Sequence, residues 1–270
     1  MIRIKTEQEI MAMRPAGALS KIALRKAGEQ VVPGTTTYAI DKLVEGIIRA
    51  HGGTPAFLNY NGFPASTCIS INNEVVHGIP SQQRTLNDGD VVSIDTGAIV
   101  DGWVGDNAWT FYCGTPSAEA RELCEVTRDC LAAAINEALP NNHLGDIGNA
   151  VQSLAERHGF GVLRDYVGHG VGKTMHEEPQ VPNYGQKGRG IKLQVGMVIA
   201  IEPMIVKGSN KVKVMPNKWT VVTRDGSLAA HYENTVAITS DGPYILTEDA
   251  LGPWCALQGG MDQTINAKGA

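Results

Sequence analysis

Two apolar runs joined by a single turn constrain the fold of this chain more than any other feature. The runs cover Val91–Val100 and Trp103–Tyr112, and only Asp101-Gly102 separates them. Runs rich in β-branched and aromatic residues between turn residues predict strands, and Asp-Gly is a frequent two-residue hairpin turn. The sequence therefore predicts a long antiparallel hairpin.

Helical patterns precede this hairpin. Thr6 and Glu9 form the T-x-x-E pattern of a capping box, so a first helix is expected to start at Thr6. Pro15 is expected to kink or shorten that helix. A second helix is predicted from an apolar face within residues 40–48, and Gly52-Gly53 is expected to end it.

The order of elements then repeats. Two more helices are expected, one after Ser117 and one after Asp146 that closes at Gly159. Further strands are expected at Thr67–Asn72, Val162–Val167, Met197–Val206, Trp219–Arg224 and Tyr232–Thr239. Because the order helix, helix, strands occurs twice, the sequence predicts an α/β (α+β) fold with two similar halves and a site at their interface. One catalytic domain over residues 1–255 and a small, polar tail over 256–270 are expected.

Composition limits the classes of function. The formal net charge of −5 gives no reason to expect binding to nucleic acid or to an anionic membrane. The chain lacks the ~18 consecutive apolar residues of a membrane span, and its first residues, MIRIKTEQEIMAMR, have no apolar signal-peptide region. Five cysteines without a CxxC pair argue against a zinc ribbon or a full disulfide framework. A reducing compartment, the cytoplasm, is therefore expected.

Two aspartates in the hairpin are candidate metal ligands. With a two-residue loop, Asp95 lies either directly opposite Asp106 or one diagonal step away on the same face. Two carboxylates at such a short distance repel each other unless a cation lies between them. A solvated pair on an exposed strand is the ordinary alternative, but both aspartates lie in apolar contexts, SID and VGDNAW, which favours a metal site.

Three later ionisable residues also lie in apolar contexts. His169 lies in VGHGVG, Glu202 in MVIAIEPMIV and Glu233 in HYENTVAI. Each alone could be a core salt bridge or an exposed strand residue. Together with the two aspartates, they suit two divalent metals roughly 3.5–4 Å apart. Oxygen-rich ligation favours cobalt, manganese or iron, with zinc as the alternative.

These motifs, in this order, resemble those of the pita-bread metallopeptidases. The flanking runs VVHGIP, GHGVGKTMHEEPQVPNY and KWTVVTRDGSLAAHYENT resemble methionine aminopeptidases in particular, and the spacing from Glu202 to Glu233 resembles that of type I. The resemblance covers roughly residues 3–250. It implies a pita-bread fold, in which two pseudo-symmetric halves place a curved antiparallel sheet inside and helices outside.

The resemblance also implies roles for the five candidate ligands. Asp106 and Glu233 would bridge both ions, Asp95 would complete one metal, and His169 with Glu202 would complete the other. The metals would supply hydroxide for attack on the peptide carbonyl, with Glu202 as general base. The substrate would be a nascent protein whose initiator methionine precedes a small second residue.

Other positions follow from the same resemblance. His77 would help to protonate the leaving nitrogen, and His176 would donate a hydrogen bond to the oxyanion. The methionine pocket maps onto Phe57, Tyr60, Phe63, Cys68, Met175 and Trp219. Phe57 and Phe63 stand where some bacterial relatives carry cysteine and tyrosine, which leaves the fine substrate preference open.

His231 stands where bacterial relatives commonly carry glutamine. It lies two residues before Glu233, so both side chains are expected on the same strand face. His231 is therefore expected to hydrogen-bond a ligand carboxylate or a bound water, or to become an extra ligand when metal is in excess. The alternative is a bulge that turns His231 to solvent.

Two other functions stay open at this point. A proline-specific relative, an aminopeptidase P or prolidase, would share the five ligands but usually has a large N-terminal domain. A pita-bread protein that only binds peptides would have lost ligands, whereas this chain has all five. No zinc-finger extension precedes residue 3, which favours a bacterial-type enzyme. The expected partners are N-terminal methionyl peptides, with the ribosome as a further candidate, and the chain is expected to be a monomer.

Overall fold

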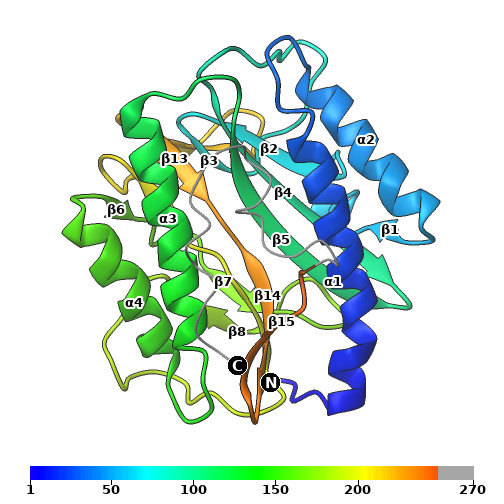
Figure 1. Ribbon diagram of the computed structural model, residues 1–270, viewed down its shortest axis with the longest axis vertical. Coiled ribbons are helices and arrows are strands. Elements are labelled where there is room, and N and C mark those ends of the chain that lie inside the picture. Colours follow the sequence, from blue (N-terminus) through cyan, green and yellow to red (C-terminus); the bar gives the residue numbers. More distant parts are fainter. Residues whose placement is uncertain (249–270) are drawn as a thin grey trace, which may run out of the picture.

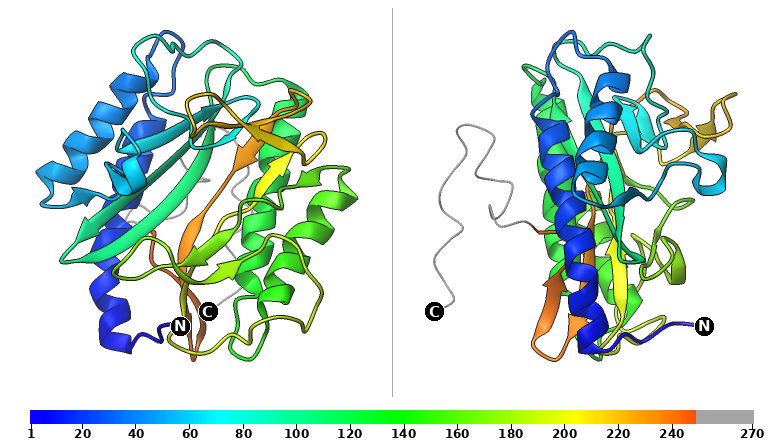
Figure 2. Two further views of the ribbon diagram at one scale, coloured as in Figure 1. Left: turned by 180° about the vertical axis from the view of Figure 1, so that it is seen from behind. Right: turned by 90° about the vertical axis from the view of Figure 1, so that its right-hand side faces the viewer.

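Helices cover one face of a set of antiparallel strands in the computed structural model, which describes residues 1–248. Helices α1 (Glu7–Gly28) and α2 (Thr37–Ala50) lie on one side of Figure 1, and α3 (Ala118–Asn136) and α4 (Leu144–Arg157) lie on the other. The side view in Figure 2 shows the helices as one layer against the strands. Each half of the chain therefore contributes two helices and a group of strands.

The predicted hairpin is confirmed. Strands β4 (Val91–Val100) and β5 (Trp103–Tyr112) pair over their whole length, from Val91 opposite Tyr112 to Val100 opposite Trp103. Asp101 and Gly102 have φ values of 50° and 76°, the positive values that a tight two-residue hairpin turn requires. Strand β4 also pairs with β1 (Thr54–Pro55) and β2 (Thr67–Ile71).

The strands of the second half form a sheet of their own. Strand β14 (Asn234–Thr239) pairs with β9 (Val198–Ile201) and β15 (Gly242–Ile245). Strand β7 (Gly168–Gly170) pairs with β9 and with β8 (Glu177–Val181). In the hydrophobic core, one cluster packs α1 and α2 on the first sheet, and another packs α3 and α4 on the second.

The continuous strands predicted at Met197–Val206 and Tyr232–Thr239 are wrong, because each is part of an interrupted segment. The first is split at Glu202-Pro203 into β9 and β10 (Met204–Val206), since proline has no N–H for a strand ladder. The second starts late, because Tyr232 and Glu233 separate β13 (Ala229–His231) from β14. Strand β10 pairs with β13 and with β6 (Gly161–Val162) rather than with the main sheet.

Two other strand predictions are too long. Only Gly161–Val162 and Gly168–Gly170 are extended around the predicted strand Val162–Val167, because Arg164 and Asp165 lie exposed in a turn between them. The strand predicted at Trp219–Arg224 is β12 (Val221–Thr223), which pairs with β11 (Val212–Val214) and β3 (Glu74–Val76) in a small sheet. A single 3-10 turn, η1 (Tyr60–Gly62), lies between β1 and β2.

The helix caps follow the sequence closely. The Thr6 hydroxyl accepts from the Glu9 amide at 3.2 Å, and the Glu9 carboxylate accepts from the Thr6 amide at 2.9 Å, which confirms the capping box. Helix α1 nevertheless continues through Pro15, because Met13 and Leu19 on either side are buried against the sheet. The prediction that Pro15 shortens the helix is therefore wrong.

The fourth helix starts earlier than predicted. It begins at Leu144 with His143 as its cap, and Asp146 accepts the His143 amide at 2.6 Å from inside the first turn. Helix α3 follows Ser117 as predicted, with the Ser117 hydroxyl accepting from Ala120 N.

The proposed boundary at residue 255 and the polar tail 256–270 lie outside the described residues. Among residues 1–248, no helix combines the length and the apolar character that crossing a membrane requires.

Candidate active site

A cavity of about 240 Å³ opens between the two halves of the molecule. Strands β4 and β5 border it from the first half, and β7 and the residues after β9 and β13 border it from the second. Its lining includes every residue that the sequence predicts for the site: Phe57, Tyr60, Phe63, Cys68, His77, Asp95, Asp106, His169, Met175, His176, Glu202, Trp219, His231 and Glu233. The structure therefore brings together residues that are scattered along the chain.

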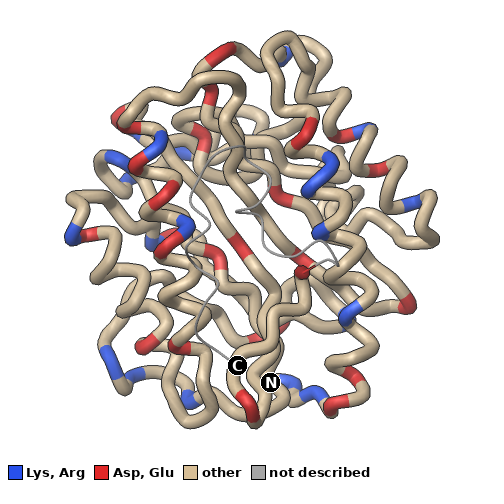
Figure 3. Tube along the Cα trace, in the orientation of Figure 1, with Lys and Arg blue, Asp and Glu red and all other residues tan. Residues whose placement is uncertain are grey.

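The two aspartates of the hairpin lie on a diagonal. Asp95 pairs with Ala108, and Asp106 pairs with Gly97, so the direct pairing that the sequence left open does not occur. Residues one diagonal step apart stay on the same face of the sheet, and both side chains enter the cavity. Figure 3 shows acidic positions on the long central strands, away from the surface where most charged residues lie.

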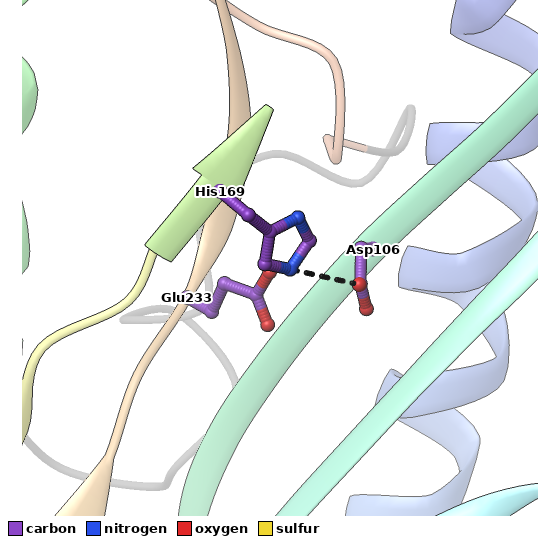
Figure 4. Close-up of side chains that lie close together, drawn as sticks. All are labelled: Asp106, His169 and Glu233. Atoms are coloured by element: carbon purple, nitrogen blue, oxygen red, sulfur yellow. Dashed lines mark ion pairs between the residues drawn. The ribbon is translucent and has the colours of Figure 1, made fainter. Parts of the chain in front are cut away.

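Three side chains from different strands converge most closely. One ligand atom each of Asp106, His169 and Glu233 lies within 4.8 Å of the others, and all three residues are buried (Figure 4). His169 Nε2 lies 3.8 Å from Asp106 Oδ2 and 3.6 Å from Glu202 Oε1. His169 Nδ1 lies 2.9 Å from the carbonyl oxygen of Gly170 and donates to it, which leaves the Nε2 lone pair facing the carboxylates.

The carboxylates carry polar atoms that the protein leaves unpaired. Asp95 Oδ1, Asp106 Oδ1 and Glu233 Oε1 are buried without a hydrogen-bond partner among residues 1–248. Buried polar atoms are normally paired, so such a cluster needs an explanation. Divalent cations provide one, because carboxylates and a neutral imidazole are ordinary ligands for them.

The electrostatics of the cluster agree with this explanation. Burial, followed by the charge of neighbouring carboxylates, raises the pKa of Asp95, Glu202 and Glu233 well above the ordinary values. Burial also raises the pKa of Asp106 to about 7 and lowers the pKa of His169 to about 4. Cations would favour ionised carboxylates and leave the imidazole neutral, so the residues present fit a metal centre.

Two further histidines stand beside this cluster. His176 Nδ1 lies 2.8 Å from the Tyr60 hydroxyl, and the two rings stack at 5.3 Å. The His77 ring meets the edges of Tyr166 and Trp219, with centroids 5.7 and 6.3 Å away. Burial lowers the pKa of His176, and burial lowers the pKa of His77 to about 4. Both rings are therefore neutral at pH 7, and each offers one N–H donor and one acceptor nitrogen.

One wall of the cavity is apolar. Phe57, Phe63, Cys68 and Met175 are buried there, and the Trp219 ring contacts Phe63 edge-on at 5.1 Å. Cys68 of β2 pairs directly with Asp95 of β4, so this wall is joined to the acidic cluster by neighbouring strands. Burial raises the pKa of the Cys68 thiol, which stays neutral. An apolar, sulfur-containing wall suits a flexible unbranched side chain.

His231 points into the protein. Its side chain is buried, and its Nε2 lies 3.4 Å from Glu202 Oε2. The strand is interrupted at Tyr232 and Glu233, but His231 is buried, so the alternative in which it is turned to solvent is wrong.

Sequence reasoning missed several residues that line the cavity or contact its lining residues. Tyr166 and Met204 line it, and Asn183 Nδ2 donates to the Glu202 carbonyl at 2.9 Å. Met204 could have been found, because it lies two residues after Glu202 and strand alternation tends to put both on one side. Tyr166 and Asn183 carry no local signal, since each is brought in by the fold.

A family model and known sequences match this chain over most of its length. The model of metallopeptidase family M24 matches residues 11–240. A methionine aminopeptidase of Clostridium acetobutylicum is 52% identical over 92% of this chain and 99% of its own length, and methionine aminopeptidase 1 of Bacillus subtilis is 45% identical with the same coverage.

Solved structures agree with these sequence matches. The crystal structure of methionine aminopeptidase from Thermotoga maritima has a TM-score of 0.91 at 45% identity, and covers 92% of this chain and all of its own. Prolidase from Pyrococcus furiosus has a TM-score of 0.71 at 28% identity, and this chain spans only 65% of it. The predicted pita-bread fold is thereby confirmed.

Proposed function

The chain belongs to metallopeptidase family M24, and on that premise we propose that it removes the initiator methionine from new proteins whose second residue is small. It is a metallo-hydrolase of the methionine aminopeptidase type, as its relatives are. The observation that carries the proposal is one cavity in which four carboxylates and His169 face an apolar, sulfur-containing wall.

The acidic cluster would hold two divalent cations. Asp106 and Glu233 would bridge them, Asp95 would complete one coordination sphere, and His169 with Glu202 would complete the other. The unpaired oxygens of Asp95, Asp106 and Glu233 support this assignment. When bound, the cations would activate a water molecule and polarise the peptide carbonyl. Cobalt, manganese and iron are the expected metals, with zinc as the alternative.

Three residues would carry the protons of the reaction. The Glu202 carboxylate accepts the proton of the attacking water. His176 Nδ1 lies 2.8 Å from the Tyr60 hydroxyl, and with the hydroxyl as donor Nε2 would carry the proton and donate to the developing oxyanion. The proton that Glu202 takes from the water would then pass through the neutral His77 ring, held between Tyr166 and Trp219, to the leaving nitrogen.

The apolar wall would select methionine. Phe57, Phe63, Cys68, Met175 and Trp219 offer aromatic and sulfur contacts to a thioether. Tyr60, stacked on His176, would link this pocket to the reacting carbonyl. A free α-amine near Asp95 would restrict cleavage to the first peptide bond.

His231 would act on Glu202. Its Nε2 faces the Glu202 carboxylate at 3.4 Å, so it can hydrogen-bond the general base or a bound water. In excess metal the same nitrogen could serve as an additional ligand, because it has no hydrogen-bond partner among the described residues.

Peptide hydrolysis tests the function. The chelator-treated protein would be assayed on Met-Ala-Ser, Met-Leu-Ser and Ala-Pro-Ala, alone and with Co²⁺, Mn²⁺, Fe²⁺ or Zn²⁺. We expect metal-dependent cleavage of Met-Ala-Ser only, with Met-Leu-Ser as the control for a bulky second residue. Cleavage of Ala-Pro-Ala without cleavage of Met-Ala-Ser would move the chain to the proline-specific branch. Stoichiometric metal without any cleavage would favour a peptide-binding protein.

The partners follow from this function. New chains emerge from the ribosome, so the ribosome is the proposed place of encounter, and the proposed state is a monomer. Co-sedimentation with ribosomes and light scattering after gel filtration would measure both.

A further inference from the structure

We propose that the N-terminal strap, residues Arg3–Lys5, positions the loop that carries Met175 and His176 through an ion pair between Lys5 and Glu177. The strap precedes α1, and in Figure 1 it enters beside the lower strands of the second half. The positioning itself stands on the geometry below, and only its effect on turnover rests on the proposed function.

The ion pair is almost sealed from water. Lys5 Nζ lies 2.8 Å from Glu177 Oε2, and the two side chains are 1% and 14% exposed. Removing both charges from water is costly, so such a pair is weak evidence for stability. Its geometric effect is stronger, because a mostly buried carboxylate is directed toward the cation beside it.

Glu177 also closes the loop on itself. Its other oxygen, Oε1, accepts from the amides of Lys173 and Thr174, at 3.0 and 3.5 Å. A Cβ at position 172 would lie 2.2 Å from Oε1, so Gly172 is what lets the carboxylate sit inside the turn. The Glu177 carboxylate therefore lies inside the turn, where it contacts the loop amides, and Lys5 contacts it from outside the loop.

The strap itself is held against Gly196. The Lys5 amide donates to the Gly196 carbonyl at 2.7 Å, and a Cβ at Gly196 would lie 2.5 Å from the Lys5 carbonyl oxygen. Gly196 has a φ of +93°, which few other residues adopt. The main chain of Lys5 is therefore held in place, and its side chain, 1% exposed, extends from there to Glu177.

A second contact ties the loop to the strap. The Arg3 guanidinium and the Lys173 ammonium group lie 5.4 and 5.2 Å from the centre of the Trp103 ring. The amide of the next residue, Val104, donates to the Gly172 carbonyl at 2.9 Å. The start of β5 is thus in contact with both the strap and the loop.

The loop delivers two side chains to the cavity. Met175 lines its apolar wall, and His176, the residue before Glu177, lies against Tyr60 and His169. Without Lys5, the Glu177 carboxylate would turn toward water, and its hydrogen bonds with the amides of Lys173 and Thr174 would weaken. His176 would then lose its fixed direction, although no metal ligand is removed. Lys5 and Glu177 are therefore positioning residues.

The first test compares Lys5→Met with Lys26→Met in the full chain. Lys26 is the matched control, because it pairs with Glu29 on the surface, where its side chain is 52% exposed. We expect Lys5→Met to speed amide hydrogen exchange within residues 171–177 of the metal-free protein. We also expect it to lower kcat on Met-Ala-Ser about 10-fold, less than the about 10²–10³-fold loss of an absent oxyanion donor. Metal content should change little, because no ligand is removed, and Lys26→Met should match the wild type.

A double-mutant cycle tests the pair itself. Glu177→Gln keeps an oxygen for the two amides but loses the charge, so Lys5→Met/Glu177→Gln should be no worse than the more damaging single change. Lys5→Arg, which keeps a cation, should restore part of the protection and kcat, and Glu177→Gln replaces Lys5→Met as the disrupting change if that variant does not fold. Unchanged exchange in the loop, or effects of the two changes that simply multiply, would overturn the proposal. If the wild type fails to cleave Met-Ala-Ser, the proposed function falls, whereas the exchange measurement still decides the positioning.

Discussion

The side chain of Thr235 holds both main-chain groups of Asp106. Its Oγ1 accepts from the Asp106 amide at 3.1 Å and donates to the Asp106 carbonyl at 2.7 Å. Thr110 does the same for His231, with distances of 3.0 and 2.8 Å. The segments carrying Asp106 and Glu233 come from different halves, and these two threonines join them.

Thr235→Val should weaken the protein and its metal site together. Valine keeps the shape but leaves the buried amide and carbonyl of Asp106 unpaired, and each unpaired group costs about 1–3 kcal/mol. We expect a lower free energy of unfolding in urea for the metal-free protein and weaker metal binding by calorimetry. Thr235→Ser, which keeps the hydroxyl, should stay close to the wild type in both. Normal metal affinity in the valine variant would show that this contact does not set the site.

Asp106→Asn should abolish hydrolysis and most metal binding. A bridging carboxylate offers charge to both cations, and an amide cannot replace it. Asp101→Asn is the matched control, because Asp101 is exposed in the hairpin turn and asparagine tolerates its φ of 50°. Metal per protein, measured by atomic absorption, and initial rates are the readouts. The assignment of Asp106 fails if the Asp106 variant keeps the metal content and rate of the wild type.

His77→Ala and His176→Ala should lower kcat far more than metal occupancy. Neither residue is assigned as a ligand, and loss of a proton donor or oxyanion donor costs about 10²-fold or more. His158→Ala, a change at a half-exposed histidine paired with Glu122, should leave turnover unchanged. If metal is lost from either active-site variant, that histidine is a ligand and its assignment has to change.

His231→Gln should leave an active enzyme with an altered metal preference or pH dependence. His231 Nε2 faces the Glu202 carboxylate at 3.4 Å, and a glutamine amide changes this contact with the general base and removes a ring nitrogen that can bind metal. Rates across pH with each metal would measure the change. Superimposable pH and metal profiles would make His231 a neutral substitution.

Much of the fold could be predicted because the relevant signals are local. The capping box at Thr6 and Glu9 and the turn at Asp101-Gly102 are each complete within a few residues. The bounds of β4 and β5 also match the two apolar runs on either side of this turn. The failures at Glu202-Pro203 and Tyr232-Glu233 arise where the chain passes between sheets, which strand periodicity does not record.

The candidate site divides in the same way. The sequence by itself determined which residue types are available: carboxylates and histidines isolated in apolar strands, whose burial demands a partner. It also limited Asp95 and Asp106 to two relative positions, and the hairpin register then selected the diagonal one. Only the tertiary structure decided that the Thr235 hydroxyl clamps Asp106 and that Lys5 meets Glu177. These contacts join positions far apart in the chain, and they depend on how the two halves pack against each other, for which no local pattern of residues carries a signal.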